Sequence, residues 1–259
     1  MLQGHLNAIS DEIWERLKDA KQLRISQGEE TITDNILLYL FRQHIGVIRI
    51  VPTPKNKEKF QGTDWEWWIG NNRDGWLRYA IQAKKLNQQT NKYESLNHQV
   101  GKKPNQQSQH RILETYATAN HAIPLYAFYN HIDLDDYTPY WHCSNMLDVK
   151  KLGCTVTPLK NVKNALSTRG SRTFQTIHSF EETIPIRCLA ICPSIYGACK
   201  GINSRFHLEK LGIDATIFQN IDLFNEPIND FKQLPNSLYN HEIALYPKRI
   251  LIIKTQDGI

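Results

Sequence analysis

Hydrophobic residues recur along the first half of the chain with the period of a helix. Between residues 29 and 44 they fall at three- and four-residue spacing, which predicts an amphipathic helix: Ile32, Ile36, Leu37, Leu40 and Phe41. A helix is also predicted from Ser10, whose side chain suits an N-cap before two acids, to about Leu23. A third is predicted over 106–120.

Strand-like segments separate and follow these helices. Two aromatic and β-branched runs around the loop NNRDG are typical of a β-hairpin. The signal weakens after residue 131, where 139–143 and 153–159 read as short strands or loops and 184–192 as a strand or a buried helical turn. The predicted strands are 47–51, 64–69, 76–84, 123–129 and 247–255. Helices and strands together predict an α/β fold.

The faces of the hairpin bring polar side chains together. Alternate residues of a strand share a face, so Asp64 and Glu66 point one way, and Gln82 and Lys84 share a face of the return strand. If the turn is NNRDG, Asp64 lies opposite Gln82 and Glu66 opposite Ala80, within reach of one another. We therefore expect Asp64, Glu66, Gln82 and Lys84 to form one patch.

Such a patch suits metal-dependent hydrolysis of phosphodiesters. Carboxylate and amide oxygens are ligands for Mg²⁺ or Mn²⁺, and a neighbouring lysine can orient water and stabilise the charge of the phosphate transition state. The simpler interpretation is a cross-strand salt bridge between Asp64 or Glu66 and Lys84 on an exposed face. Spacing alone favours the salt bridge.

The order of these motifs resembles that of the PD-(D/E)xK nuclease superfamily. An acidic helix (GEETITD) precedes a strand, then Asp64 in GTDWEWWIG, and then Gln82-Ala83-Lys84 in YAIQAKKL, with Asp64 and Gln82 separated by 18 positions. The Q-x-K form is similar to that of Mrr-like restriction enzymes and antiphage effector nucleases. The resemblance covers residues 28–130 and looks most like a bacterial branch of the superfamily.

This resemblance implies a restriction-endonuclease-like mixed sheet flanked by helices and a Mg²⁺- or Mn²⁺-dependent endonuclease that acts on DNA, with defence against foreign DNA as its role. Lys84 would position the attacking water, and either Glu30 or Glu29 would add an acid from the preceding helix. Gln109 matches a glutamine on the helix that follows the lysine strand. The metal ligands implied are Asp64, Gln82 and Ala83, with Glu66 as a further acid.

Positive charge supports an anionic partner. The formal net charge is +5, and the stretch 84–103 holds five lysines and one acid. Neutralising phosphates would make DNA binding salt-dependent; RNA stays open as a substrate, and a solvated loop is the simpler interpretation. Beyond Lys84, the lysines expected to contact phosphate are Lys85, Lys92, Lys102 and Lys103.

The remaining features set the context of this chemistry. Residues 1–259 are expected to form one domain: an N-terminal helix over 1–27, a nuclease-like core over 28–130, and a C-terminal part over 131–259 packed on that core. No apolar run suits a membrane span and the N-terminus lacks a signal core, so we expect a cytoplasmic protein. A second copy of the chain or a partner subunit stays open.

Two other functions compete with the nuclease. One is a catalytically silent module that keeps the fold and binds nucleic acid or a partner protein, because Gln82 replaces an acid. The other is a nucleotide sensor in which Trp68 and Trp76 stack on a base. The five cysteines are expected to be core residues rather than zinc ligands with His142 or His207.

Overall fold

The computed structural model describes most of the chain. Its described residues are 2–43, 46–52, 61–133, 148–168, 171–190, 216–221, 223 and 245–255. The α-helices are α1 (Leu2–Leu23), α2 (Glu29–Arg42), α3 (Gln109–Ala119), α4 (Leu159–Ser167), α5 (Phe174–His178) and α6 (Arg187–Ala190), with 3₁₀ turns η2 (Glu94–Asn97) and η4 (Val149–Gly153).

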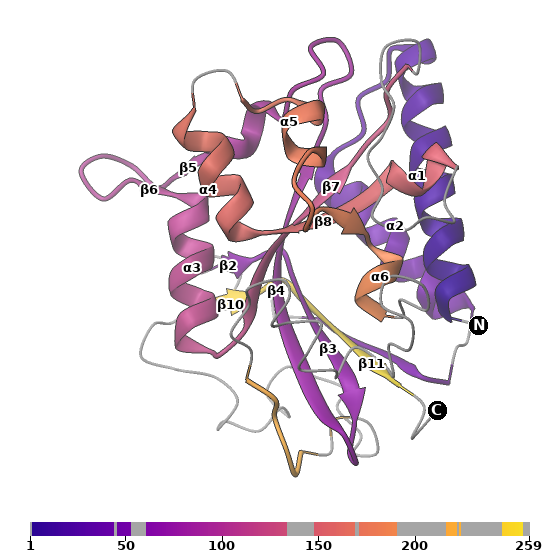
Figure 1. The fold of residues 1–259 in the computed structure, drawn as a ribbon, viewed down its shortest axis with the longest axis vertical. Coiled ribbons are helices and arrows are strands. Elements are labelled where there is room, and N and C mark those ends of the chain that lie inside the picture. Colours follow the sequence, from indigo (N-terminus) through magenta and orange to yellow (C-terminus); the bar gives the residue numbers. More distant parts are fainter. Residues whose placement is uncertain are drawn as a thin grey trace. The chain divides into compact units, whose positions relative to one another are not determined.

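Strands complete this mixed α/β fold, whose class is as predicted (Figure 1). They are β1 (Ile48–Pro52), β2 (Gln61–Thr63), β3 (Trp65–Asn71), β4 (Gly75–Lys85), β5 (Gln99–Val100), β6 (Gln107–Ser108), β7 (Ile123–Tyr129), β8 (Cys154–Pro158), β9 (Ile184–Pro185), β10 (Tyr246–Pro247) and β11 (Arg249–Lys254). Seven of them form one sheet in the order β1-β11-β3-β4-β7-β8-β9. The sheet is mixed, because β11 runs parallel to β3 and antiparallel to β1.

The chain divides into two compact units, each assembled from three segments. The first unit comprises Met1–Arg42, Ala83–His98 and Tyr126–Cys199, and the second comprises Gln43–Gln82, Gln99–Leu125 and Lys200–Ile259. Strand β4 passes from the second unit into the first after Gln82, and β7 does so after Leu125. Of the candidate residues on β4, Gln82 belongs to the second unit, and Ala83 and Lys84 belong to the first.

In the first unit, α1 is longer than the sequence pattern predicts. The predicted start at Ser10 is wrong, because the helix begins at Leu2 and the Ser10 hydroxyl donates to the Leu6 carbonyl oxygen at 3.2 Å. A serine hydroxyl can bond one turn back inside a helix as well as cap its start. Gly153 lets the chain pass close to α1, since a Cβ at this position would collide with the Ser10 carbonyl oxygen.

Helix α2 matches its predicted span and most of its predicted core face. Ile32, Ile36 and Leu40 are buried. Phe41 is the exception: its side chain is 65% exposed, so the expectation that it faces the core is wrong. The apolar face of α2 is narrower than the spacing of its hydrophobic residues suggested.

The second unit contains the predicted hairpin in its predicted register. Glu66 pairs with Ala80, and the ladder continues to Asn71 and Gly75, so the turn has three residues between the strands. The adjacent strand on the other side of β3 is β11, whose apolar residues are buried. A C-terminal strand thus lies inside the sheet between β1 and the hairpin.

Several other sequence predictions can be compared with the structure. Residues 153–159 include β8, and 184–192 include β9 and α6. Helices α4 and α5 lie between β8 and β9, in a region without a clear sequence pattern. Cys154 and Cys188 are buried and unbridged, as expected of core cysteines. No described helix is both long and apolar enough to cross a membrane. The following lie outside the described residues: the predicted strand 139–143, Cys143, Cys192, Cys199, His142 and His207.

Candidate functional site

In the second unit, Asp64 and Gln82 come together as predicted. Asp64 lies between β2 and β3, where its backbone N–H donates to the Ile81 carbonyl oxygen at 3.2 Å. Its Oδ2 accepts a hydrogen bond from Nε2 of Gln82, and its Oδ1 lies 3.4 Å from Nζ of Lys248. Lys248 comes from the link between β10 and β11. Sequence reasoning missed it, because no local pattern places the end of the chain beside the hairpin.

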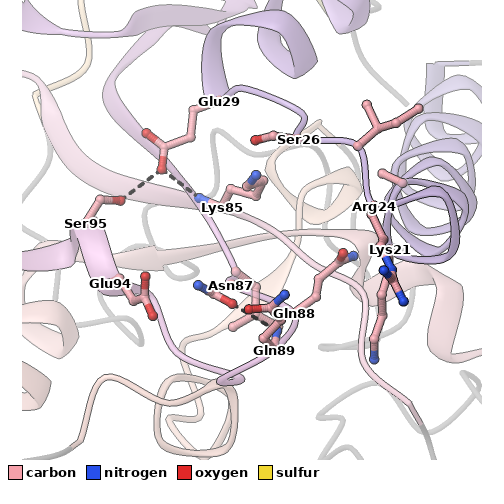
Figure 2. A pocket seen from close by; sticks show the side chains of 13 residues that line it. Lys21, Arg24, Ser26, Glu29, Lys85, Asn87, Gln88, Gln89, Glu94 and Ser95 are labelled. Carbon is pink, nitrogen blue, oxygen red and sulfur yellow. Dashed lines mark hydrogen bonds between the residues drawn. The ribbon is translucent and has the colours of Figure 1, made fainter.

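In the first unit, Glu29 pairs with Lys84, and Figure 2 shows its hydrogen bonds to Lys85 and Ser95. Glu29 is the first residue of α2, and its Oε2 lies 3.8 Å from Nζ of Lys84. Its Oε1 accepts from the backbone N–H of Lys85 at 2.9 Å and from Oγ of Ser95 at 3.0 Å. The Glu30 side chain one residue later is exposed. The acid that faces Lys84 is therefore Glu29, a choice the helical period left open.

Strand β4 carries both Gln82, which bonds Asp64, and Lys84, which pairs with Glu29. Gln82, Ala83 and Lys84 are consecutive in its hydrogen-bonded span, so Gln82 and Lys84 share one face and Ala83 lies on the other. Lys84 is buried, with 3% of its side chain exposed. The predicted salt bridge on an exposed sheet face therefore does not describe this lysine.

Glu66 lies in a buried cluster of its own. Its side chain is fully buried in the second unit, where Oε2 lies 2.9 Å from Nη2 of Arg78 and accepts from the Tyr116 hydroxyl at 2.5 Å. Its Oε1 accepts from Nε1 of Trp68 at 2.6 Å. Both oxygens are thus bonded to protein donors away from solvent, so we leave Glu66 out of the candidate site.

The two tryptophans expected to stack on a base are also buried. Trp68 and Trp76 have no exposed surface. The Trp68 indole bonds Glu66, and Nε1 of Trp76 donates to the Ile221 carbonyl oxygen at 3.0 Å. The expectation that these rings stack on a nucleotide base is wrong, because no base can reach them.

The basic residues predicted to contact phosphate belong to both units. Lys85 donates its ammonium group to the Gln27 carbonyl oxygen at 2.5 Å. Lys92 in the first unit and Lys102 and Lys103 in the second are exposed. Gln109 begins α3 in the second unit. These three exposed lysines can reach a solvated anion, whereas the Lys85 ammonium already has a partner.

The side chains around Asp64 include one amide and one lysine. In the described part of the chain, no three His, Cys, Asp or Glu side chains gather as a metal cluster. Mg²⁺, however, binds through one or two protein carboxylates and completes its shell with water and phosphate oxygens. The structure shows one such carboxylate, Asp64, beside the amide of Gln82. Lys248 already places a positive charge beside the same carboxylate.

The fold and these two clusters define a mixed α/β protein with a carboxylate–amide pair in one unit and a carboxylate–lysine pair in the other. The chain belongs to the family of unknown function DUF6615, whose sequence profile matches residues 2–247. No curated protein matches the chain. Any assignment of activity therefore depends on the chemistry of the residues themselves.

Proposed function

We propose that the protein is a metal-dependent nuclease that hydrolyses phosphodiester bonds of DNA. One observation supports the proposal: two residues of β4 are each paired with a carboxylate. Gln82 bonds Asp64, and Lys84, two residues further along the same face, pairs with Glu29. An acid, an amide, a lysine and a helix acid are the groups that metal-assisted phosphodiester hydrolysis uses.

The oxygen donors near Asp64 would hold the metal. The Asp64 carboxylate and the Gln82 amide oxygen are hard ligands that suit Mg²⁺ or Mn²⁺, and the resemblance to the nuclease superfamily adds the Ala83 carbonyl oxygen as a third. When bound, the ion would place positive charge against the phosphate oxygens and make a bound water more acidic. Lys248 would then share the Asp64 carboxylate with the ion or turn toward the phosphate.

Lys84 would act at the phosphate, and Glu29 would position Lys84. The Lys84 ammonium group is held in a buried place by the Glu29 carboxylate, which is itself fixed by the Lys85 N–H and the Ser95 hydroxyl. Charge fixed in advance stabilises a transition state without the cost of reorganisation. Lys84 would donate to the attacking water or to a non-bridging phosphate oxygen.

Replacing Lys84 tests this function most directly. We expect Lys84→Met to lower the rate of DNA cleavage about a hundredfold or more, because it removes one preorganised charge and keeps the buried stem. Cleavage of plasmid, linear DNA, single-stranded DNA and RNA would be measured in Mg²⁺ and in Mn²⁺, with Lys18→Met, at an exposed lysine of α1 outside the proposed site, as the control. Cleavage that is equally fast in both variants would rule out the role of Lys84.

A silent binding module is the second candidate, and the surroundings of Asp64 favour it. Position 82 is an amide rather than an acid, and the one carboxylate nearby already has Lys248 at 3.4 Å. Binding of DNA by the wild-type protein without cleavage in either metal would favour this module over the nuclease.

A further inference from the structure

An open pocket lies in the first unit beside the Glu29–Lys84 pair. Its volume is about 670 Å³, within the range of sites for small molecules. The end of α1, the turn into α2 and the segment after β4 line it, and Glu29 forms part of its wall (Figure 2). The pocket is therefore large enough for one nucleotide and adjoins a residue of the proposed site.

Helix α1 ends at this pocket in an unusual way. The Ile25 N–H donates to the Ala20 carbonyl oxygen at 2.8 Å and the Arg24 N–H to the Lys21 carbonyl oxygen at 3.2 Å, which is the bonding pattern of a Schellman cap. The residue at the left-handed position of such a cap is usually glycine, but here it is Arg24, with φ of 56°. A bulky residue in this conformation is strained, and such strain often marks a functional position.

The Arg24 side chain is the available cation of the pocket. It is exposed, and its guanidinium makes no hydrogen bond or ion pair with the rest of the described chain. The other two cations have partners, since Lys21 pairs with Asp133 and Lys85 donates to Gln27. A guanidinium offers a planar pair of N–H donors that fits phosphate.

Of the two acids of the pocket, Glu29 is paired with a cation, whereas Glu94 bonds a neutral hydroxyl and keeps its negative charge, so Arg24 is the group that would attract an anion. Glu29 bonds Lys84, Lys85 and Ser95, and Oε1 of Glu94 accepts from the Thr90 hydroxyl at 3.1 Å. Amide side chains line the wall opposite the turn. Oδ1 of Asn87 accepts hydrogen bonds from the backbone N–H groups of Gln89 and Thr90, so the N–H donors of its amide point away from these two groups.

We propose that this pocket binds a nucleotide through its phosphate monoester, with Arg24 on the phosphate and the amides of Asn87 and Gln89 on the base. The nucleotide is either the 5′-phosphorylated end of a DNA strand or a free nucleoside monophosphate. The proposal rests on the proposed nuclease in that a bound strand end would lie beside Glu29. Its binding chemistry requires no cleavage.

The test measures binding by the full-length protein in EDTA, where metal-dependent cleavage cannot occur. The probes are a short single-stranded DNA with a 5′-phosphate, the same DNA with a 5′-hydroxyl, and the corresponding free nucleoside monophosphate. We expect the phosphorylated end to bind about tenfold or more tightly than the hydroxyl end, as for a hydrogen bond to a charged group. Tight binding of the free monophosphate would identify a nucleotide sensor, and its absence a site for strand ends.

Arg24→Gly gives the test a readout that a merely structural role would not produce. Glycine relieves the left-handed strain, so this variant should melt at a higher temperature than the wild type and yet lose the preference for phosphate. Arg42→Ala, an exposed arginine of α2 outside the pocket, is the control and should keep that preference. Equal affinity of the wild type for both ends, or an unchanged preference in Arg24→Gly, would overturn the proposal. Loss of cleavage in Lys84→Met with this preference intact would separate the two proposals.

Discussion

Asp64 and Glu66 are two residues apart in the same unit, yet their surroundings differ completely. Asp64 is partly exposed and bonds Gln82 and Lys248, both of which a ligand can displace. Glu66 is buried against Arg78, Trp68 and Tyr116. A carboxylate can hold a metal only if its oxygens can exchange partners, and only Asp64 meets that condition. The comparison therefore separates a chemical role from a structural one among acids that look equivalent in the sequence.

The largest expected effect is on stability, at Glu66. Glu66→Gln should lower the free energy of unfolding by about 3–5 kcal/mol, because it leaves the Arg78 cation buried without its counter-charge. Denaturant unfolding would measure this loss, with Asp64→Asn as the matched control, expected to change stability by no more than about 1 kcal/mol. Similar small losses in both variants would contradict the division between the two acids.

The next effect is on activity, at Asp64. Asp64→Asn should reduce metal-dependent cleavage about a hundredfold, a change of roughly 2.7 kcal/mol in the activation free energy, because it weakens the metal site. Excess Mn²⁺ should restore part of the rate. The same titration applied to Lys84→Met should restore none, since that variant keeps its metal ligands. Full activity of Asp64→Asn would remove Asp64 from the site.

A smaller effect is expected on DNA binding, at the exposed lysines. Unlike the buried Arg78, these lysines can contact a phosphate. Replacing Lys92, Lys102 and Lys103 with alanine should weaken DNA binding and flatten its dependence on salt. The logarithmic slope should fall by about 0.7–0.9 for each phosphate that is no longer neutralised. Fluorescence anisotropy at several salt concentrations would measure the slope. A slope equal to that of the wild type would mean that these lysines are only solvated.

The smallest expected effect is on the Mg²⁺ requirement of cleavage, at Lys248 beside Asp64. Lys248→Ala should lower the Mg²⁺ concentration that gives half-maximal cleavage by up to about fivefold, because a partly exposed ion pair of up to about 1 kcal/mol no longer competes with the metal. A metal titration of cleavage rates would measure the shift. An increase in that concentration instead would show that Lys248 assists the metal site.

The sequence was sufficient for elements whose pattern is local. The alternation in the hairpin predicted that Glu66 lies opposite Ala80, and the helical period predicted α2, because side-chain direction in one element depends only on its own backbone. It was not sufficient for choices that depend on distant segments. Glu29 differs from Glu30 only because Lys84 and Ser95 approach from other parts of the chain.

By itself, then, the sequence determined the α/β class, the register of the hairpin and the pairing of Asp64 with Gln82. Only the tertiary structure decided that β11 inserts beside β3, that Lys248 reaches Asp64, and that Tyr116 and Arg78 enclose Glu66. The physical reason is that short-range order follows from backbone geometry. Burial and ion pairing instead depend on which surfaces, far apart in the chain, exclude water from one another.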